Sequence, residues 1–209
     1  MGRLFGTDGA RGVANTELSC ETAMAIGRAA AMVLAEAEHH KPKVVIGKDT
    51  RISSDMLEAA LVAGFCSVGA DVLLLGVLPT PAVAYLVKAY GADAGVMISA
   101  SHNPCEYNGI KIFNSEGYKL SDALEEEIEA IVLDGAKTPP CPTGGDIGRV
   151  SSCKNAVDDY VRHLLSVTDV DLRGMRLAVD CANGSASATA RKLFSALGAD
   201  CVFLSDQPD

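Results

Sequence analysis

Three short apolar runs, separated by segments with a helical pattern, constrain most what this chain can fold into. The runs are residues 43–47, 72–75 and 94–98. Their β-branched and leucine-rich composition is typical of buried strands. The first intervening segment begins a helix at Ser53 or Ser54, and the second begins one at Pro79-Thr80-Pro81. Strands joined through helices favour a mixed α/β fold, in which helices sandwich a mainly parallel sheet.

Other helices and strands flank this core. Ser19 is a good N-cap for a long alanine-rich helix, and Ser121 for an acidic helix that ends at Gly135. Between the third strand and the acidic helix, residues 109–113 and 118–120 predict a hairpin, because Asn114 to Gly117 supply turn residues. We expect these antiparallel strands to lie at the edge of the parallel sheet.

A segment rich in proline and glycine, residues 136–150, divides the chain. The region after it predicts a helix at 156–167, a strand at 176–181, a helix at 186–197 and a strand at 201–204. Two strands make a sheet too small to cover its helices. We therefore expect a first domain at residues 1–135, a linker at 136–154 and an incomplete second α/β domain at 155–209.

Composition narrows the class of protein. The chain has 209 residues, 48% of them hydrophobic, and a net charge of −9, which argues against a nucleic-acid or membrane-surface partner. Its seven cysteines form no CxxC pair, so reduced thiols are favoured over disulfides or a zinc site. No apolar run approaches the roughly 18 residues that span a bilayer. We expect a soluble, cytoplasmic protein.

Polar loops at the ends of the predicted strands are the candidate site. The sequences are GTDGARG (residues 6–12), GKDTR (47–51) and the segment 99–111, and a fourth break, DCANG, covers 180–184. The first three supply Thr7 and four cations, Arg11, Lys48, Arg51 and Lys111. Cations, hydroxyls and glycine-exposed backbone N–H groups together suit a phosphate. Ordinary turns with solvated charges are the alternative for any one loop.

Ser101 is the candidate nucleophile, in the sequence ISASHNP. A hydrolase would use His102 as its base, although neighbours on an extended chain point to opposite sides, and no GxSxG elbow is present. Ser101 could instead carry a phosphoryl group stabilised by the surrounding cations. A third interpretation is a turn in which Ser99, Ser101 and Asn103 only satisfy backbone groups.

The motifs ISASHNPxxxNGIK, GTDGARG and GKDTR together resemble the α-D-phosphohexomutase family over essentially the whole chain. The resemblance implies that Ser101 becomes a phosphoserine, with Lys111 as general acid and base and Arg11 on the transferring phosphoryl group. His102 and Asn103 would shape the loop and contact that group. Thr7, Lys48 and Arg51 complete the set expected at substrate or phosphate.

Within the family, Asp8, Ser99 and the run GADVLLLGVLPTPAVAYL are most similar to bacterial enzymes that interconvert glucosamine 6-phosphate and glucosamine 1-phosphate. The resemblance implies one Mg²⁺ ion, bound by the Ser101 phosphate and by three aspartates of a DGDGDR-type loop. That loop does not occur in the 209 residues, so we expect this chain alone to be inactive.

Two other functions stay open at this stage. One is a phosphomannomutase or phosphoglucomutase of the same family, and the other is a protein that binds sugar phosphates without catalysis. The expected partner is a hexosamine phosphate. A homodimer through the alanine-rich segment 21–37 is a further expectation, although packing on its own sheet explains those alanines equally well.

Overall fold

The computed structural model describes residues 2–38 and 40–208. Within them, the main sheet has six strands in the order β1-β5-β4-β2-β3-β6. Strands β2, β3, β4 and β6 run parallel, whereas β5 is antiparallel to both β4 and β1. The fold class expected from the sequence, a mainly parallel mixed sheet, is confirmed. The strand bounds are β1 Ala10–Val13, β2 Lys43–Lys48, β3 Asp71–Val77, β4 Ala94–Ile98, β5 Tyr107–Asn114 and β6 Val150–Ser152.

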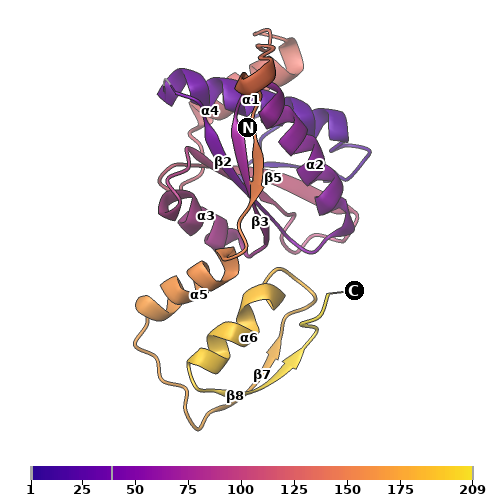
Figure 1. The fold of residues 1–209 in the computed structure, drawn as a ribbon. Helices are drawn as coiled ribbons and strands as arrows, with labels where there is room; N and C mark the ends of the chain where they lie inside the picture. Colours follow the sequence, from indigo (N-terminus) through magenta and orange to yellow (C-terminus); the bar gives the residue numbers. More distant parts are fainter. Residues whose placement is uncertain (1, 39, 209) are drawn as a thin grey trace.

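Helices cover both faces of this sheet (Figure 1). One face carries α1 (Cys20–Glu38), α2 (Ile52–Ser67) and α4 (Asp122–Asp134). The other carries α3 (Thr80–Ala89) and α5 (Ala156–Ser166). Side chains alternate along a strand, so Val44 and Ile46 pack under the first set of helices while Val45 packs under the second. Burial on both faces explains why β2 is a continuous apolar run.

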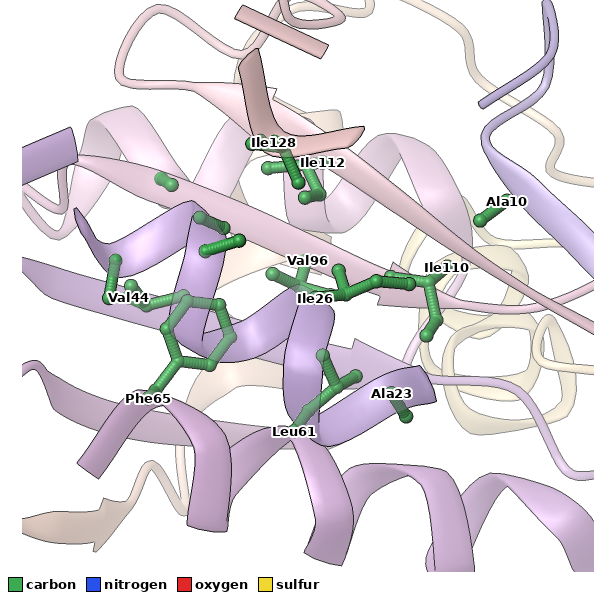
Figure 2. Close-up of a cluster of buried hydrophobic side chains, with 14 of the residues drawn as sticks. Ala10, Ala23, Ile26, Val44, Leu61, Phe65, Val96, Ile110, Ile112 and Ile128 are labelled. Atoms are coloured by element: carbon green, nitrogen blue, oxygen red, sulfur yellow. The ribbon is translucent and has the colours of Figure 1, made fainter. Parts of the chain in front are cut away.

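Figure 2 shows the larger of the two cores, between the sheet and α1, α2 and α4. Phe65, Leu61, Ile26 and Ile128 come from the helices and are fully buried. Each such side chain contributes about 1.5–3 kcal/mol by leaving water. This core includes Ala10, Val96, Ile110 and Ile112 from three neighbouring strands, so it fixes β1, β4 and β5 where the polar loops begin.

Helices α1 and α2 cross closely because glycine occurs on both sides of the contact. A Cβ atom at Gly64 would lie 2.3 Å from the carbonyl oxygen of Met24, and one at Gly27 would lie 2.8 Å from that of Leu61. Four alanines of α1 are buried in the core between the chain's own sheet and helices, namely Ala23, Ala29, Ala30 and Ala31. The expected homodimer through this helix stays a prediction, and these contacts supply the alternative explanation for its alanines.

Several boundaries differ from those expected. The structure adds strand β1, which pairs with β5 and forms the edge of the sheet. The second arm of the hairpin is reduced to a single bridge between Phe113 and Lys119. Helix α2 begins at Ile52 with Arg51 as its N-cap, not at Ser53 or Ser54.

The segment expected to be a linker returns to the sheet, because its last residues form β6 beside β3. Helix α5 follows and packs against α3, where the rings of Tyr85 and His163 stack 3.7 Å apart. The division into domains at 135 and 155 stays a prediction, and these contacts tie residues 150–166 to the first sheet. Helix α4 is capped by Ser121 as expected, and it ends at Gly135.

The last part of the described chain forms a smaller α/β unit (Figure 1). Strands β7 (Arg176–Asp180) and β8 (Asp200–Leu204) are parallel, and α6 (Ser187–Ala196) connects them. One face of this pair is open, with Val202 62% and Leu204 50% exposed. Across residues 2–38 and 40–208, the helices found are each too short or too polar to cross a membrane.

Candidate functional site

Ser101 lies in a tight loop at the carboxyl end of β4. The backbone of Ser101 is left-handed, with φ at 59°, and its side chain is exposed. Ser99 supports it from below, since its Oγ accepts a 3.0 Å hydrogen bond from the Ser101 N–H. A 2.9 Å bond from the Ser99 N–H to the carbonyl of Gly109 closes the base of the loop. The interruption between β4 and β5 therefore presents one serine hydroxyl to solvent.

His102 is brought back beside Ser101 by this left-handed turn. Its Nδ1 lies 3.4 Å from the Ser101 Oγ, which is longer than the roughly 2.6–3.2 Å typical of a nucleophile and its base. The turn that the hydrolase interpretation required is present, but the close contact is not. This position is compatible with the role predicted for His102, which is to shape the loop.

Arg51 binds the serine loop through its backbone. Its guanidinium donates to four carbonyl oxygens, at distances of 2.6 to 3.0 Å, and its Nε donates to Asp49 Oδ2 at 2.9 Å. All five N–H donors of the guanidinium are thereby used. The predicted contact of Arg51 with a phosphate would require at least one of these bonds to break. The carbonyl acceptors belong to Ser101, Asn103, Pro104 and Tyr107.

A buried polar network supports these hydrogen bonds from Arg51 to the serine loop, which we call the Arg51 clamp. Asp49 Oδ1 accepts from the Arg51 N–H and from Ser54 Oγ, at 3.1 and 2.8 Å. Asn108 Nδ2 in turn donates to Ser54 Oγ at 3.0 Å, and Asn108 Oδ1 accepts from the Gly109 N–H at 2.8 Å. The network joins the GKDTR and NGIK motifs, which are more than 50 residues apart, so both ends of the serine loop are held.

Arg11 and Lys111 lie on neighbouring strands and share one carboxylate. Asp8 Oδ2 is 3.2 Å from Arg11 Nη1, and Asp8 Oδ1 is 3.8 Å from Lys111 Nζ. A Cβ at Gly109 would lie 2.9 Å from Arg11 Cγ, so the missing side chain leaves room for the Arg11 side chain beside β5. The Arg11 Nε is buried and has no hydrogen-bond partner among the described residues. This pair of cations thus includes one unused donor.

Lys48 points to other partners. Its Nζ lies 2.5 Å from Glu58 and 2.7 Å from Asp55, both on α2. Burial alone would lower the pKa of Lys48, but the hydrogen bonds and charges of these carboxylates outweigh it and raise that pKa. Lys48 is therefore paired with two carboxylates of α2, which offset its charge toward a phosphate.

Thr7 and Asn103 lie in separate hollows. Thr7 is exposed and shares a hollow of about 180 Å³ with Asp8 and Lys111. Asn103 is half-buried and lines a larger cleft of about 730 Å³ with Ser101 and His102. Thr80, at the start of α3, borders both hollows, so they lie on either side of one residue.

The opposite wall of the larger cleft is the loop between β7 and α6, residues 181–186. Ala182 and Asn183 are both left-handed, with φ of 51° and 50°, and Asp180 Oδ1 accepts from the Ala182 N–H. Thr50 Oγ1 donates to the Asn183 carbonyl at 2.6 Å and joins the two walls. The sequence marks this loop as a polar break after a strand, but it does not indicate that the loop faces Ser101.

The described residues do not form a metal site by themselves. Over 2–38 and 40–208, no group of three or more His, Cys, Asp or Glu side chains is placed to hold a metal ion. Asp49, the carboxylate nearest in sequence to the clamp, is only 7% exposed and is occupied by Arg51 and Ser54. A Mg²⁺ ion at Ser101 would need ligands from outside this set.

Comparisons with known proteins identify the family of the chain. Residues 2–138 match the family model for phosphoglucomutase/phosphomannomutase, alpha/beta/alpha domain I. A phosphoglucosamine mutase from Clostridium novyi is 57% identical over all 209 residues, and another from Acetivibrio thermocellus is equally similar. The chain covers 46% of each of these relatives, or about half of their length.

Solved structures show the same fold. A phosphoglucomutase/phosphomannomutase family protein from Burkholderia thailandensis matches 99% of this chain and 44% of its own, with a TM-score of 0.80 and 30% identity. A structure described as a putative phosphomannomutase, from Thermus thermophilus, matches the whole chain and 47% of its own, with a TM-score of 0.83 and 26% identity. The chain belongs to the phosphoglucomutase/phosphomannomutase family.

Proposed function

We propose that the protein acts as a phosphoglucosamine mutase, interconverting glucosamine 6-phosphate and glucosamine 1-phosphate through a phosphoserine at Ser101. The observation that carries this proposal is the 57% identity, over all 209 residues, with relatives of that name. The exposed, left-handed Ser101 at a cleft supports it. Because the chain spans about half of those relatives, the whole reaction is proposed for the longest gene product that contains it.

In the first transfer, a sugar hydroxyl attacks the phosphorus of phosphoserine, and the bond between phosphorus and the Ser101 Oγ breaks. The hydroxyl proton passes to Lys111 as general base, and Lys111 as general acid then gives a proton to the departing Ser101 Oγ. The sugar then carries two phosphates. After this bisphosphorylated sugar reverses its orientation in the site, Ser101 takes the other phosphoryl group by the reverse steps. A serine phosphate and a sugar phosphate are both alkyl esters, so neither transfer is strongly uphill.

Arg11 is the cation we propose for the transferring phosphoryl group. Its charge is shared only with Asp8 in the ion pairs found among the described residues. Charge-assisted bonds from a guanidinium to phosphate are short and strong. Every guanidinium donor of Arg51 is already used, so a direct role for it at phosphate requires rearrangement. Lys48 is paired with two carboxylates, which offset its charge.

Mg²⁺ remains part of the proposal, with limits set by the donors present. A phosphate on Ser101 could supply one oxygen ligand, and when bound the ion would neutralise charge on the transferring group. The described residues hold no group of three or more His, Cys, Asp or Glu side chains that could complete its ligand set. The steps above are written without the metal. Because its ligand set is incomplete here, we propose that this chain alone turns over substrate negligibly. A cytoplasmic location stays a prediction.

Sugar specificity separates this proposal from its nearest alternative. A phosphomannomutase or phosphoglucomutase is the second candidate, because a solved relative is described as a putative phosphomannomutase. Its identity is only 26%, against 57% for the phosphoglucosamine mutases, which favours the first candidate.

The test uses the longest gene product with glucosamine, glucose and mannose phosphates as competing substrates. We expect the highest kcat/KM with glucosamine phosphate, and loss of turnover in Ser101→Ala. Higher kcat/KM with mannose or glucose phosphate would favour the second candidate. Full activity in the Ser101→Ala variant would contradict the phosphoserine itself.

A further inference from the structure

We propose that Arg51 is a positioning residue for phosphoryl transfer, which holds the Ser101 hydroxyl in place by binding the backbone of its loop. The inference rests on the proposed function, since it assigns a role in that reaction. It changes the role expected for Arg51, from contact with a phosphate to control of the nucleophile's position.

The first support is the set of acceptors. Arg51 Nη2 donates to the carbonyls of Ser101 and Asn103, at 3.0 and 2.7 Å. Its Nη1 donates to those of Pro104 and Tyr107, at 2.6 and 2.9 Å. One rigid, planar group thus reaches four peptide units across seven residues of the loop. These bonds constrain the loop's backbone directly.

The second support is the backbone of Ser101 itself. A serine at φ 59° occupies a region that non-glycine residues seldom adopt, and such conformations persist only where their surroundings over-determine them. Arg51 binds the carbonyl of this same residue, and Ser99 Oγ binds its N–H at 3.0 Å. Both sides of Ser101 are therefore held, while its side chain remains exposed.

The third support is how Arg51 is anchored. Its Nε donates to Asp49 Oδ2 at 2.9 Å, and its own N–H donates to Asp49 Oδ1 at 3.1 Å. The side chain of Arg51 is only 11% exposed and that of Asp49 9%. A buried carboxylate with two bonds to one residue leaves the guanidinium little freedom to swing toward a substrate.

A lysine cannot reproduce this arrangement. Its ammonium group has three donors at one point, whereas the guanidinium has five in a fixed plane. Arg51→Lys therefore keeps the charge and removes most of the clamp. Arg28→Lys is the matched control, because Arg28 is also half-buried, on α1, and its Nε donates to Ser67 Oγ, away from the loop.

The experiment compares wild type, Arg51→Lys, Asp49→Asn and Arg28→Lys in the longest gene product, by peptide hydrogen exchange and by steady-state kinetics. In Arg51→Lys and Asp49→Asn we expect faster exchange in residues 99–107 with unchanged exchange in β2 and α1. We expect kcat to fall by on the order of 10²-fold with KM nearly constant, because small misplacements of a nucleophile have effects of that size. Arg28→Lys should match wild type in both measurements.

Ethylguanidinium added to Arg51→Ala should restore part of kcat if the clamp acts as inferred. Unchanged exchange in 99–107, or a looser loop with normal kcat, would overturn the inference. A large rise in KM at constant kcat would also overturn it, because Arg51 would then bind substrate. Wild type without mutase activity would contradict the proposed function instead, and the exchange data would still decide whether Arg51 fixes the loop.

Discussion

The side-chain amide of Asn108 donates a hydrogen bond to Ser54 Oγ at 3.0 Å, and both residues are completely buried. Asn108 also donates to Ser53 Oγ at 2.9 Å and accepts from the Gly109 N–H. A single amide therefore joins the beginning of α2 to the strand that follows the serine loop. Buried polar groups of this kind are costly to leave unpaired.

Asn108→Ala should destabilise the protein by about 2–4 kcal/mol, because it leaves the Gly109 N–H and the two serine hydroxyls without this partner. Urea denaturation of the 209-residue chain measures the loss. Asn155→Ala is the control, since Asn155 is exposed at the start of α5 and should change stability by less than about 0.5 kcal/mol. Equal stabilities of the two variants would contradict the network.

Gly64→Ala should also destabilise the fold, by about 1–3 kcal/mol, because a methyl group would lie 2.3 Å from a backbone oxygen of α1. The helices would have to move apart and loosen the core between them. Gly145→Ala is the matched control, because no described atom lies within 4 Å of a Cβ there. Thermal unfolding compares the pair, and a neutral Gly64→Ala would contradict the close crossing.

Glu129 should make part of the stability depend on pH. Burial raises the pKa of Glu129, but hydrogen bonds from the backbone N–H groups of Phe5, Leu4 and Arg3 outweigh it, so that pKa lies below its ordinary 4.5. Since the folded pKa is the lower one, the contribution is present above pH 4.5 and is lost as the pH falls through the folded value.

Glu129→Gln should therefore be less stable than wild type by about 1–3 kcal/mol at neutral pH, with the difference shrinking in acid. Urea denaturation at about pH 7 and about pH 3 measures the difference in the free energy of unfolding between variant and wild type at each pH. Glu126→Gln, an exposed neighbour on α4, should show little difference at either pH. A stability difference for Glu129→Gln that is the same at both pH values would contradict the assigned role of the carboxylate.

Thr50→Val should loosen the loop that faces Ser101, because it removes the 2.6 Å bond from Thr50 Oγ1 to the Asn183 carbonyl. We expect faster hydrogen exchange in residues 181–186 and unchanged exchange in β2 and β4. Thr138→Val, at an exposed position, is the control. Identical exchange in Thr50→Val and wild type would show that this bond does not hold the two walls together.

The sequence predicts the core of the fold well, because its apolar patterns report burial directly. Continuous runs such as that around Val45 need two covered faces, and the structure supplies them. Strand β1 is missed because Arg11 and Gly12 give it no apolar pattern, and only its pairing with β5 makes it a strand. The hairpin is overestimated, because residues 118–120 pair at only one position.

The candidate site, too, is only partly predictable from the sequence. The motifs identify the exposed Ser101, but a cation in a motif does not reveal its partner. Arg51 bonds to backbone carbonyls as many as 56 positions away, and backbone atoms carry no sequence signal. The ion-pair partners of Lys48 are easier to predict, because Asp55 and Glu58 are three residues apart on one face of a helix that begins close to it.

The proposed reaction depends above all on the phosphorylation of Ser101. The longest gene product is incubated with a hexose 1,6-bisphosphate, and its intact mass is measured, with fragmentation to locate the change. We predict a gain of one phosphoryl group on Ser101 and none in Ser101→Ala. A wild-type protein that never gains this mass, or a Ser101→Ala variant that gains it equally, would contradict a phosphoserine at Ser101.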